Sequence, residues 1–166
     1  MPGPRRSREP THPLPLHDRA LGLLAVRPRS RHELLQRLVS AGFDRRDVEL
    51  ELARLEAVGL VDDEQFAHDF VEHAVGRRLE GRRSVTSSLM AKGVDRGTIE
   101  RTLEGVGTDD ETRAVELARL RAGRLRSLPP DAAYRRLVSF LARRGYDGGI
   151  ARRAARLALA LDGSEE

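Results

Sequence analysis

The sequence predicts an all-α protein made of three tandem three-helix repeats, and the main observation behind this prediction is a short motif that recurs. A glycine, an apolar residue and an aspartate follow one another at residues 42–44, 93–95 and 145–147, and the glycines are 51 and 52 residues apart. In each copy the glycine can end one helix in left-handed geometry, and the aspartate can cap the next helix. This recurrence marks an internal repeat.

The second observation is the placement of apolar residues before each motif. Leu38, Leu89 and Leu141 each stand four residues before the glycine, which is the spacing of one helical face. A single unit of about 50 residues can hardly bury its own apolar faces, so neighbouring repeats are expected to pack on one another. We therefore expect an elongated, curved array.

The predicted organisation follows the motif. Residues 1–17 form a disordered N-terminal tail, because five prolines among the first 15 residues block helix and sheet. The repeats cover residues 18–61, 62–107 and 108–161. Residues 162–166 form a frayed C-terminus.

In the first repeat, Asp18 is expected to open a helix that Pro28 ends, because the residue before a proline avoids helical geometry. A capping box at residues 30–33 predicts the start of the second helix. Asp44 is expected to cap the third. The predicted apolar faces are Leu34, Leu35, Leu38 and Val39 on the second helix, and Val48, Leu52, Leu55 and Val58 on the third.

Similar signals define the other two repeats. Gly59 is expected to close the first repeat in left-handed geometry, and Asp62 and Asp63 to cap the helix that follows. A second capping box lies at residues 108–111, and the last helix is expected over residues 150–161. The predicted core includes Phe66, Phe70, Val71, Ala74, Val85, Leu89, Met90, Ile99, Leu103, Val115, Leu117, Leu120, Tyr134, Leu137, Val138, Phe140 and Leu141.

The composition narrows the class of protein. The absence of Cys excludes a disulfide framework and Cys-ligated zinc, and fits a reducing compartment. No apolar run approaches the roughly 18 residues of a membrane span, and no signal-peptide pattern is present, so a cytoplasmic protein without membrane contact is expected. A net charge of +4 permits binding to nucleic acid or to an acidic protein surface without requiring it.

The sequence offers only incomplete catalytic motifs. His32-Glu33 begins an H-E-x-x-H pattern, but Gln36 stands where the second histidine belongs. His68, Glu72 and His73 miss the inverted zinc motif by one residue of spacing, although His68 and Glu72 are one helical turn apart. We predict no catalytic residues, no cofactor, no metal and no enzymatic activity.

Basic residues instead gather near predicted helix junctions. A basic junction that recurs along the array can line a track for phosphates. Because the chain also has 26 acidic residues, any single arginine is explained equally well as part of a solvated surface. The residues predicted to bind a partner or DNA are Arg77, Arg78, Arg82, Arg83, Lys92, Arg143 and Arg144.

Four segments resemble one known family when they are taken in order. They are Ala20-Leu21 with R-P-R-S-R-H-E-L-L at 27–35, G-L-V-D-D-E-Q-F-A at 59–67, the pattern that runs from Arg78 through K-G-V at 92–94, and R-L-V-S-F-L-A-R-R-G-Y at 136–146. The chain resembles the RecX regulatory proteins, modulators of the RecA recombinase, over about residues 18–159. It departs from the pattern at Gly148-Gly149.

This resemblance implies three tandem three-helix repeats and a non-enzymatic role. It implies binding to the RecA–single-stranded DNA filament and inhibition of strand exchange, ATP hydrolysis and the coprotease function, which would modulate DNA repair and the SOS response. The expected partners are RecA and single-stranded DNA, contacted directly or through the filament, and the chain is expected to be a monomer. Whether inhibition acts by capping or by blocking the groove stays open. The alternative is a stand-alone helix-turn-helix-like DNA-binding module.

Overall fold

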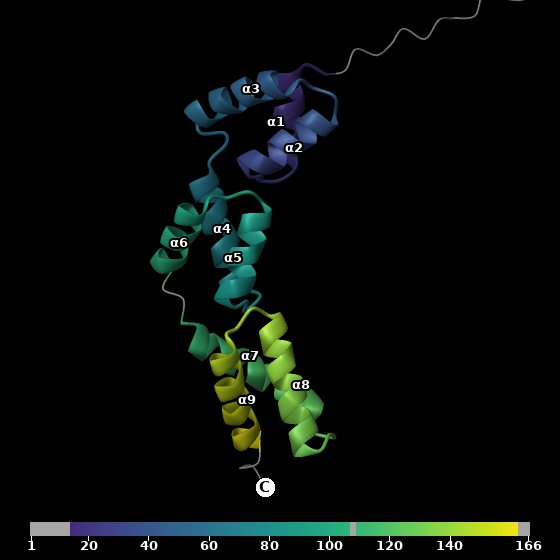
Figure 1. Ribbon diagram of the computed structural model, residues 1–166, viewed down its shortest axis with the longest axis vertical. Coiled ribbons are helices and arrows are strands. Elements are labelled where there is room, and N and C mark those ends of the chain that lie inside the picture. The colour runs from purple at the N-terminus through teal and green to yellow at the C-terminus, as the bar shows by residue number, and fades with distance from the viewer. Residues whose placement is uncertain (1–13, 107–108, 163–166) are drawn as a thin grey trace, which may run out of the picture. The chain divides into compact units, whose positions relative to one another are not determined.

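The computed structural model describes residues 14–106 and 109–162, and all regular structure within them is helical. The prediction of an all-α fold is confirmed (Figure 1). The elements are α1 (Leu16–Val26), α2 (Arg31–Ser40), α3 (Arg45–Ala57), α4 (Asp63–Gly76), α5 (Arg82–Ala91), α6 (Arg96–Gly105), α7 (Asp110–Ala122), the short 3₁₀ helix η1 (Gly123–Leu125), α8 (Pro130–Arg143) and α9 (Gly148–Asp162).

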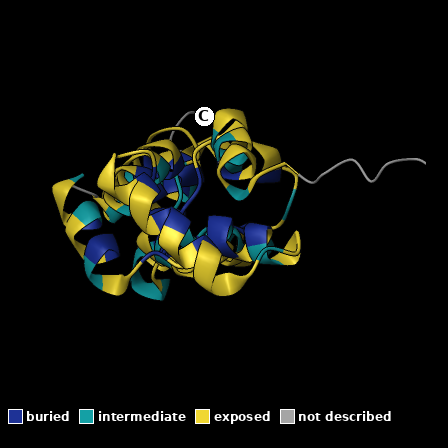
Figure 2. Ribbon diagram, turned by 90° about the horizontal axis from the view of Figure 1, so that it is seen from above, coloured by how far each residue is buried: buried dark blue, intermediate teal, exposed yellow. Residues whose placement is uncertain are grey.

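The helices gather in threes around separate apolar cores. Buried positions alternate with exposed ones along the helices (Figure 2). The chain divides into two compact units. The first comprises the residues up to Arg29 together with Glu33–Val61, and the second comprises Ser30–His32 and the residues from Asp62 onward. The second unit therefore contains the cores of α4–α6 and α7–α9. The elongation and curvature of the array remain a prediction.

The first two cores are built mostly from the predicted stripes, whereas the third consists largely of alanines that the prediction did not include. The buried residues are Ala20, Leu34, Leu35, Leu38, Val48, Leu52, Leu55 and Val61 in the first core; Phe66, Ala67, Val71, Ala74, Val75, Val85, Leu89, Val94, Ile99 and Leu103 in the second; and Ala114, Leu117, Ala118, Ala122, Leu125, Ala133, Leu137, Leu141, Tyr146, Ala151, Ala154, Ala155 and Ala158 in the third. The third core is rich in alanine, so α7 and α9 can approach closely.

The recurring glycine ends a helix in the same way three times. Gly42, Gly93 and Gly145 have φ angles of 98°, 74° and 89°, which confirms the predicted left-handed geometry. The residue after each glycine donates its backbone N–H to the carbonyl of the leucine four residues before that glycine, at 3.1–3.3 Å. This hydrogen bond satisfies a helix-end carbonyl and explains why leucine and glycine keep their spacing.

Three predicted core residues are on the surface instead. Val58, Met90 and Leu120 are 70%, 55% and 67% exposed. Val58 is the C-cap of α3, where the helix ends. Met90 and Leu120 are on the outer sides of α5 and α7. The spacing of apolar residues in the sequence therefore predicted a wider buried face than these helices have.

Two helix boundaries differ from the prediction. Helix α1 begins at Leu16, two residues before Asp18, and the His17 imidazole lies 2.6 Å from the carboxylate of Glu51 on α3. Helix α9 begins at Gly148 because Asp147 accepts the backbone N–H of Gly149 at 2.8 Å. The predictions for residues 1–13, for Thr108 and for residues 163–166 lie outside the described residues.

Adjacent aspartates perform two different caps at the start of α4 and again at the start of α7. Asp62 and Asp109 each cap their own helix. Asp63 instead accepts the backbone N–H of Arg31 at 2.8 Å, and Asp110 accepts that of Arg82 at 3.2 Å. Asp110 therefore caps α5, the middle helix of the preceding repeat, and joins the two repeats of the second unit.

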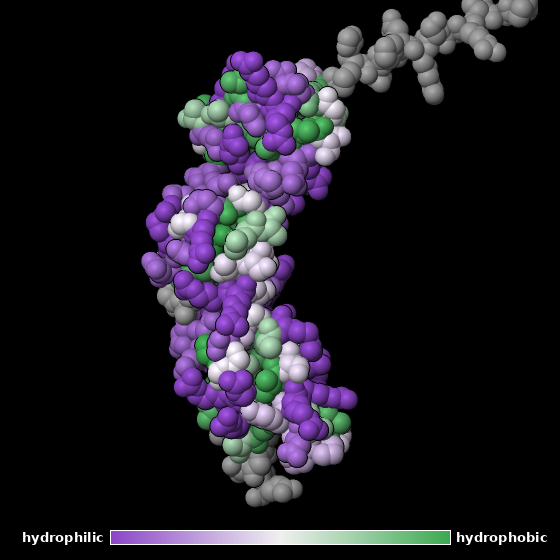
Figure 3. Space-filling view, in the orientation of Figure 1, coloured by the Kyte–Doolittle hydropathy of each residue, from purple (hydrophilic) through white to green (hydrophobic). Residues whose placement is uncertain are grey.

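Hydrophilic side chains cover most of the visible face, interrupted by small hydrophobic areas (Figure 3). Within the described residues, none of the helices has the length and apolar character needed to span a bilayer.

Candidate partner-binding surface

The seven residues predicted to bind a partner all belong to the second unit, and most of them meet where α4–α6 joins α7–α9. The backbone N–H of Gly81 donates to the carbonyl of Arg144 at 2.8 Å, and that of Arg83 donates to the carbonyl of Gly145 at 3.1 Å. These bonds place the start of α5 against the end of α8. We call the residues 77–84 and 143–147 the inter-repeat junction.

Within this junction, Arg144 has a structural role. Its Nη2 donates to the carbonyl of Arg78, and its guanidinium lies 5.9 Å from the centre of the Phe140 ring. The Arg78 side chain lies 3.6 Å from the carboxylate of Glu80. Both guanidiniums therefore have a partner in the same chain, although the Arg78 side chain is 55% exposed, and Arg144 holds the loop that precedes α5.

Arg83 is also engaged within the junction. Its Nη2 lies 2.7 Å from the Oδ2 atom of Asp147. The Gly149 backbone N–H, followed by the positive charge of Arg83, holds the pKa of the Asp147 carboxyl below its usual value. Asp147 therefore caps α9 and pairs with Arg83, although solvent screens this pair because its side chains are 71% and 52% exposed.

Tyr146 supports the same loop from the third core. Its hydroxyl donates to the carbonyl of Leu79 at 2.7 Å, and Leu79 itself has a positive φ of 49°. Left-handed geometry is costly for a leucine and persists only where neighbours enforce it. The Leu79 side chain also packs against the core of α7–α9, so two contacts stabilise this strained residue.

Burial raises the pKa of Tyr146 from 10 to about 12. The neutral phenol is thus favoured in the folded state, and the stability it confers is present below pH 10 and is lost as the pH rises toward 12. We expect Tyr146→Phe to flatten the decline of the unfolding free energy between these pH values, measured by urea unfolding. An unchanged alkaline decline in the variant would contradict this assignment.

Lys92 is separate from the junction. It follows the last residue of α5, and ten helical residues span about 15 Å. Its Nζ atom lies 6.0 and 5.8 Å from the ring centres of Phe66 and Phe70, which stack on each other. Lys92 therefore covers an aromatic pair on α4 and does not extend the junction cluster.

The remaining arginines present free guanidiniums. Arg77 and Arg143 are exposed, and so is Arg82, whose backbone N–H but not its side chain bonds Asp110. Among the residues that the structure describes, no ion pair neutralises these three side chains. They are the members of the predicted set that an anionic partner can reach without breaking an internal contact.

One basic group was missed by the sequence prediction. Arg152, Arg153 and Arg156 are exposed on α9, opposite the alanines that pack against α7. The sequence could have indicated this basic group, because residues 148–161 contain three arginines and no acidic residue.

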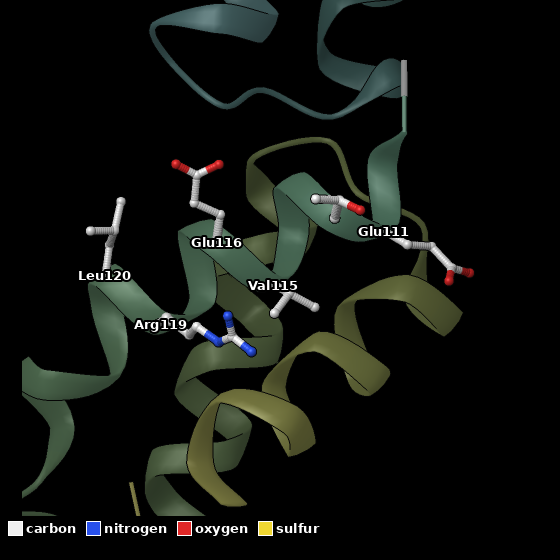
Figure 4. Close-up of a pocket in the computed structure, with 6 residues that line it drawn as sticks. Glu111, Val115, Glu116, Arg119 and Leu120 are labelled. Atoms are coloured by element: carbon white, nitrogen blue, oxygen red, sulfur yellow. The ribbon is translucent and has the colours of Figure 1, made fainter. Parts of the chain in front are cut away.

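Two other surface features lie outside the junction. The ligand atoms of His68, Asp69 and Glu72, three exposed residues of α4, lie within 4.8 Å of one another, and His73 is not part of this group. A hollow along α7 runs from Glu111 to Leu120 (Figure 4). Its lining residues all come from one helix, so it is an open groove.

Comparison with known proteins gives a consistent result. Models of the first, second and third three-helix domains of RecX match residues 17–55, 62–103 and 109–155. The chain is 38% identical over 150 residues to the regulatory protein RecX of Mycobacterium ulcerans, covering 89% of this chain and 87% of that protein. It is 37% identical over 145 residues to that of Chlorobaculum tepidum, covering 86% and 87%. The crystal structure of RecX from Lactobacillus salivarius superposes with a TM-score of 0.75 at 20% identity, covering 87% of this chain and 95% of that one.

Proposed function

Because the chain belongs to the RecX family of regulatory proteins, we propose that it is a non-enzymatic regulator that binds the RecA–single-stranded DNA filament. In this proposal it acts in the cytoplasm as a monomer and restrains strand exchange, ATP hydrolysis and the coprotease function of RecA. DNA repair and the SOS response are modulated as a consequence. The observation that carries the proposal is the match of all three repeats to RecX domains in the same order.

The inter-repeat junction supplies the contact surface in this proposal. The guanidiniums of Arg77, Arg82 and Arg143 are exposed and unpaired within the described residues, so they can bind carboxylates or phosphates. Arg78, Arg83 and Arg144 act indirectly by keeping α5 and α8 in place. Lys92 belongs to a separate position on the second unit.

The repeated architecture suits a filament as a partner. Neighbouring repeats in the second unit are joined by Asp110 and by backbone hydrogen bonds, so the distance between their surfaces is constrained. A constrained array that touches several protomers gains from effective concentration, and contacts that are individually modest then give appreciable affinity.

RecA-dependent ATP hydrolysis on single-stranded DNA tests the proposal. We expect the wild-type chain to inhibit hydrolysis at stoichiometric ratios. The variant R77A/R82A/R143A should need about tenfold more protein, because three exposed ion pairs at about 0.5 kcal/mol each together match the roughly 1.4 kcal/mol of a tenfold change. The control R19A/R46A/R135A removes the same charge from exposed positions elsewhere. Absence of inhibition by the wild type would reject the proposal. An equal loss of inhibition in R77A/R82A/R143A and in the control would reject the inter-repeat junction as the contact surface.

The stand-alone helix-turn-helix module remains the alternative hypothesis. In each repeat the glycine turn connects two helices in the order that such modules use. This alternative requires sequence-preferring duplex binding by the chain alone. A selection from random duplexes that returns no motif would remove it.

A further inference from the structure

The third helix of each repeat has the same place in the fold but a different charge. Helix α3 carries three arginines and four acidic residues, α6 carries two of each, and α9 carries three arginines and a single acidic residue at its end. The three helices are equivalent positions in one repeated unit. They therefore provide an internal comparison of which repeat offers free positive charge.

Exposed ion pairs accompany the arginines of the first two repeats. On α6, Arg96 lies 2.8 Å from Glu100, and Arg101 lies 2.8 Å from Glu64. On α3, Arg45 lies 3.5 Å from Glu49. These side chains are 47–81% exposed, so solvent screens the pairs, and the helices differ mainly in their number of carboxylates.

Helix α9 leaves its guanidiniums available. Arg152 and Arg156 are exposed, lie one helical turn apart and have no ion pair within the part of the chain that the structure describes. Arg153 lies 3.0 Å from Glu111, but these side chains are 62% and 57% exposed, so solvent screens the pair. Because α9 packs through alanines, its basic face is turned away from the core.

We propose that the exposed basic face of α9, formed by Arg152, Arg153 and Arg156, binds the phosphate backbone of single-stranded DNA directly. In helix-turn-helix units the helix after the turn faces the nucleic acid, and its N-terminal residues make the contacts. Helix α9 follows the Gly145 turn, and Arg152 and Arg153 lie in its second turn. Arginines at such positions read phosphates without sequence preference.

The first turn of α9 also fits this role. A Cβ atom added at Gly148 would lie 3.2 Å from Nη1 of Arg152, so the absence of a side chain there makes room for the guanidinium beside the helix start. The Asp147 carboxylate caps this end of α9 and interacts with Arg152, so the attraction for a phosphate comes from the guanidiniums and not from the helix end.

This inference rests on the proposed function, in which single-stranded DNA is an expected partner, and it assigns the direct contact with that DNA to α9. The experiment measures fluorescence anisotropy of labelled oligo(dT) with the full chain over a series of NaCl concentrations, without RecA. For R152A/R156A we expect the slope of log K against log salt to fall by about 1.4, since each phosphate contact on a single strand contributes about 0.7. The control R96A/R101A on α6 should keep the wild-type slope.

Alanine favours helices, so α9 should remain folded, and R152Q/R156Q gives a second variant if it does not. Equal slopes for wild type and R152A/R156A would overturn the inference, as would a wild-type chain that does not bind oligo(dT). Loss of filament inhibition by R152A/R156A without any oligo(dT) binding would also overturn it, and would assign the face to an acidic protein surface. Inhibition of RecA in the ATP hydrolysis assay is an independent result, so either proposal can fail alone.

Discussion

Gly145→Ala is expected to destabilise the second unit by about 2–5 kcal/mol, because left-handed backbone costs a non-glycine residue about 1–2 kcal/mol and overpacking costs about 1–3 kcal/mol. The φ angle of Gly145 is 89°. An added Cβ atom would lie 2.3 Å from the backbone nitrogen of Ser84 and 2.5 Å from its Cβ atom. The start of α5 would have to move away from the end of α8, so the junction should loosen with the fold.

Gly42→Ala separates the cost of left-handed backbone geometry from the cost of overpacking. Gly42 has a φ of 98°, but an added Cβ atom would meet nothing within 4 Å. This control should therefore cost only the backbone strain of about 1–2 kcal/mol. Hydrogen exchange under increasing urea measures both losses of stability. The exchange is followed on α5 and α8 for Gly145→Ala and on α2 and α3 for Gly42→Ala. If the two substitutions cost the same, the close approach of Gly145 to Ser84 is not tight in solution.

Asp110→Ala is expected to destabilise the protein much more than Asp109→Ala, although the two carboxylates are neighbours in the chain. Asp110 accepts the Arg82 backbone N–H and pairs with Arg113, and the Asp110 and Arg113 side chains are only 16% and 11% exposed. Removing one partner of a buried pair costs about 3–5 kcal/mol, because the other charge is left without compensation. Without Asp110 the Arg113 guanidinium would keep its contact with the Tyr146 side chain but lose its carboxylate, and its Nε atom already lacks a partner among the described residues.

Asp109 provides the matched comparison. It caps α7 through the backbone N–H groups of Glu111 and Thr112, and its side chain is exposed. Loss of such a cap costs about 0.5–2 kcal/mol. Urea unfolding of both variants at neutral pH checks the ranking. Similar losses, or a larger loss for Asp109→Ala, would show that Asp110 does not join the repeats as described.

The predictions from sequence succeeded where short-range physics decides the outcome. Gly42, Gly93 and Gly145 end helices because only glycine reaches positive φ at low cost, and this holds whatever surrounds them. The stripe of Leu34, Leu35 and Leu38 is buried because helical spacing alone places these residues on one face.

The predictions were weaker where a residue depends on its neighbours in space. Met90 and Leu120 continue apolar stripes in the sequence, yet nothing covers them in the described structure. The seven predicted binding residues illustrate the same dependence, because Arg78 and Arg83 look like Arg77 and Arg82 in the sequence. Only the fold shows that Arg83 pairs with a carboxylate 64 residues away.

The sequence by itself determined the helices, the glycine turns between them and the threefold repeat, since hydrogen bonding and side-chain spacing within a few residues control all three. Tertiary structure decided which charges are free and which join one repeat to the next. Asp110 became a cap for α5, and Arg144 a support for the loop at Arg78, because folding brings groups 28 and 66 residues apart into hydrogen-bonding distance. The energy of an ion pair or a cap depends on that distance and on burial, and neither quantity can be obtained from the order of residues alone.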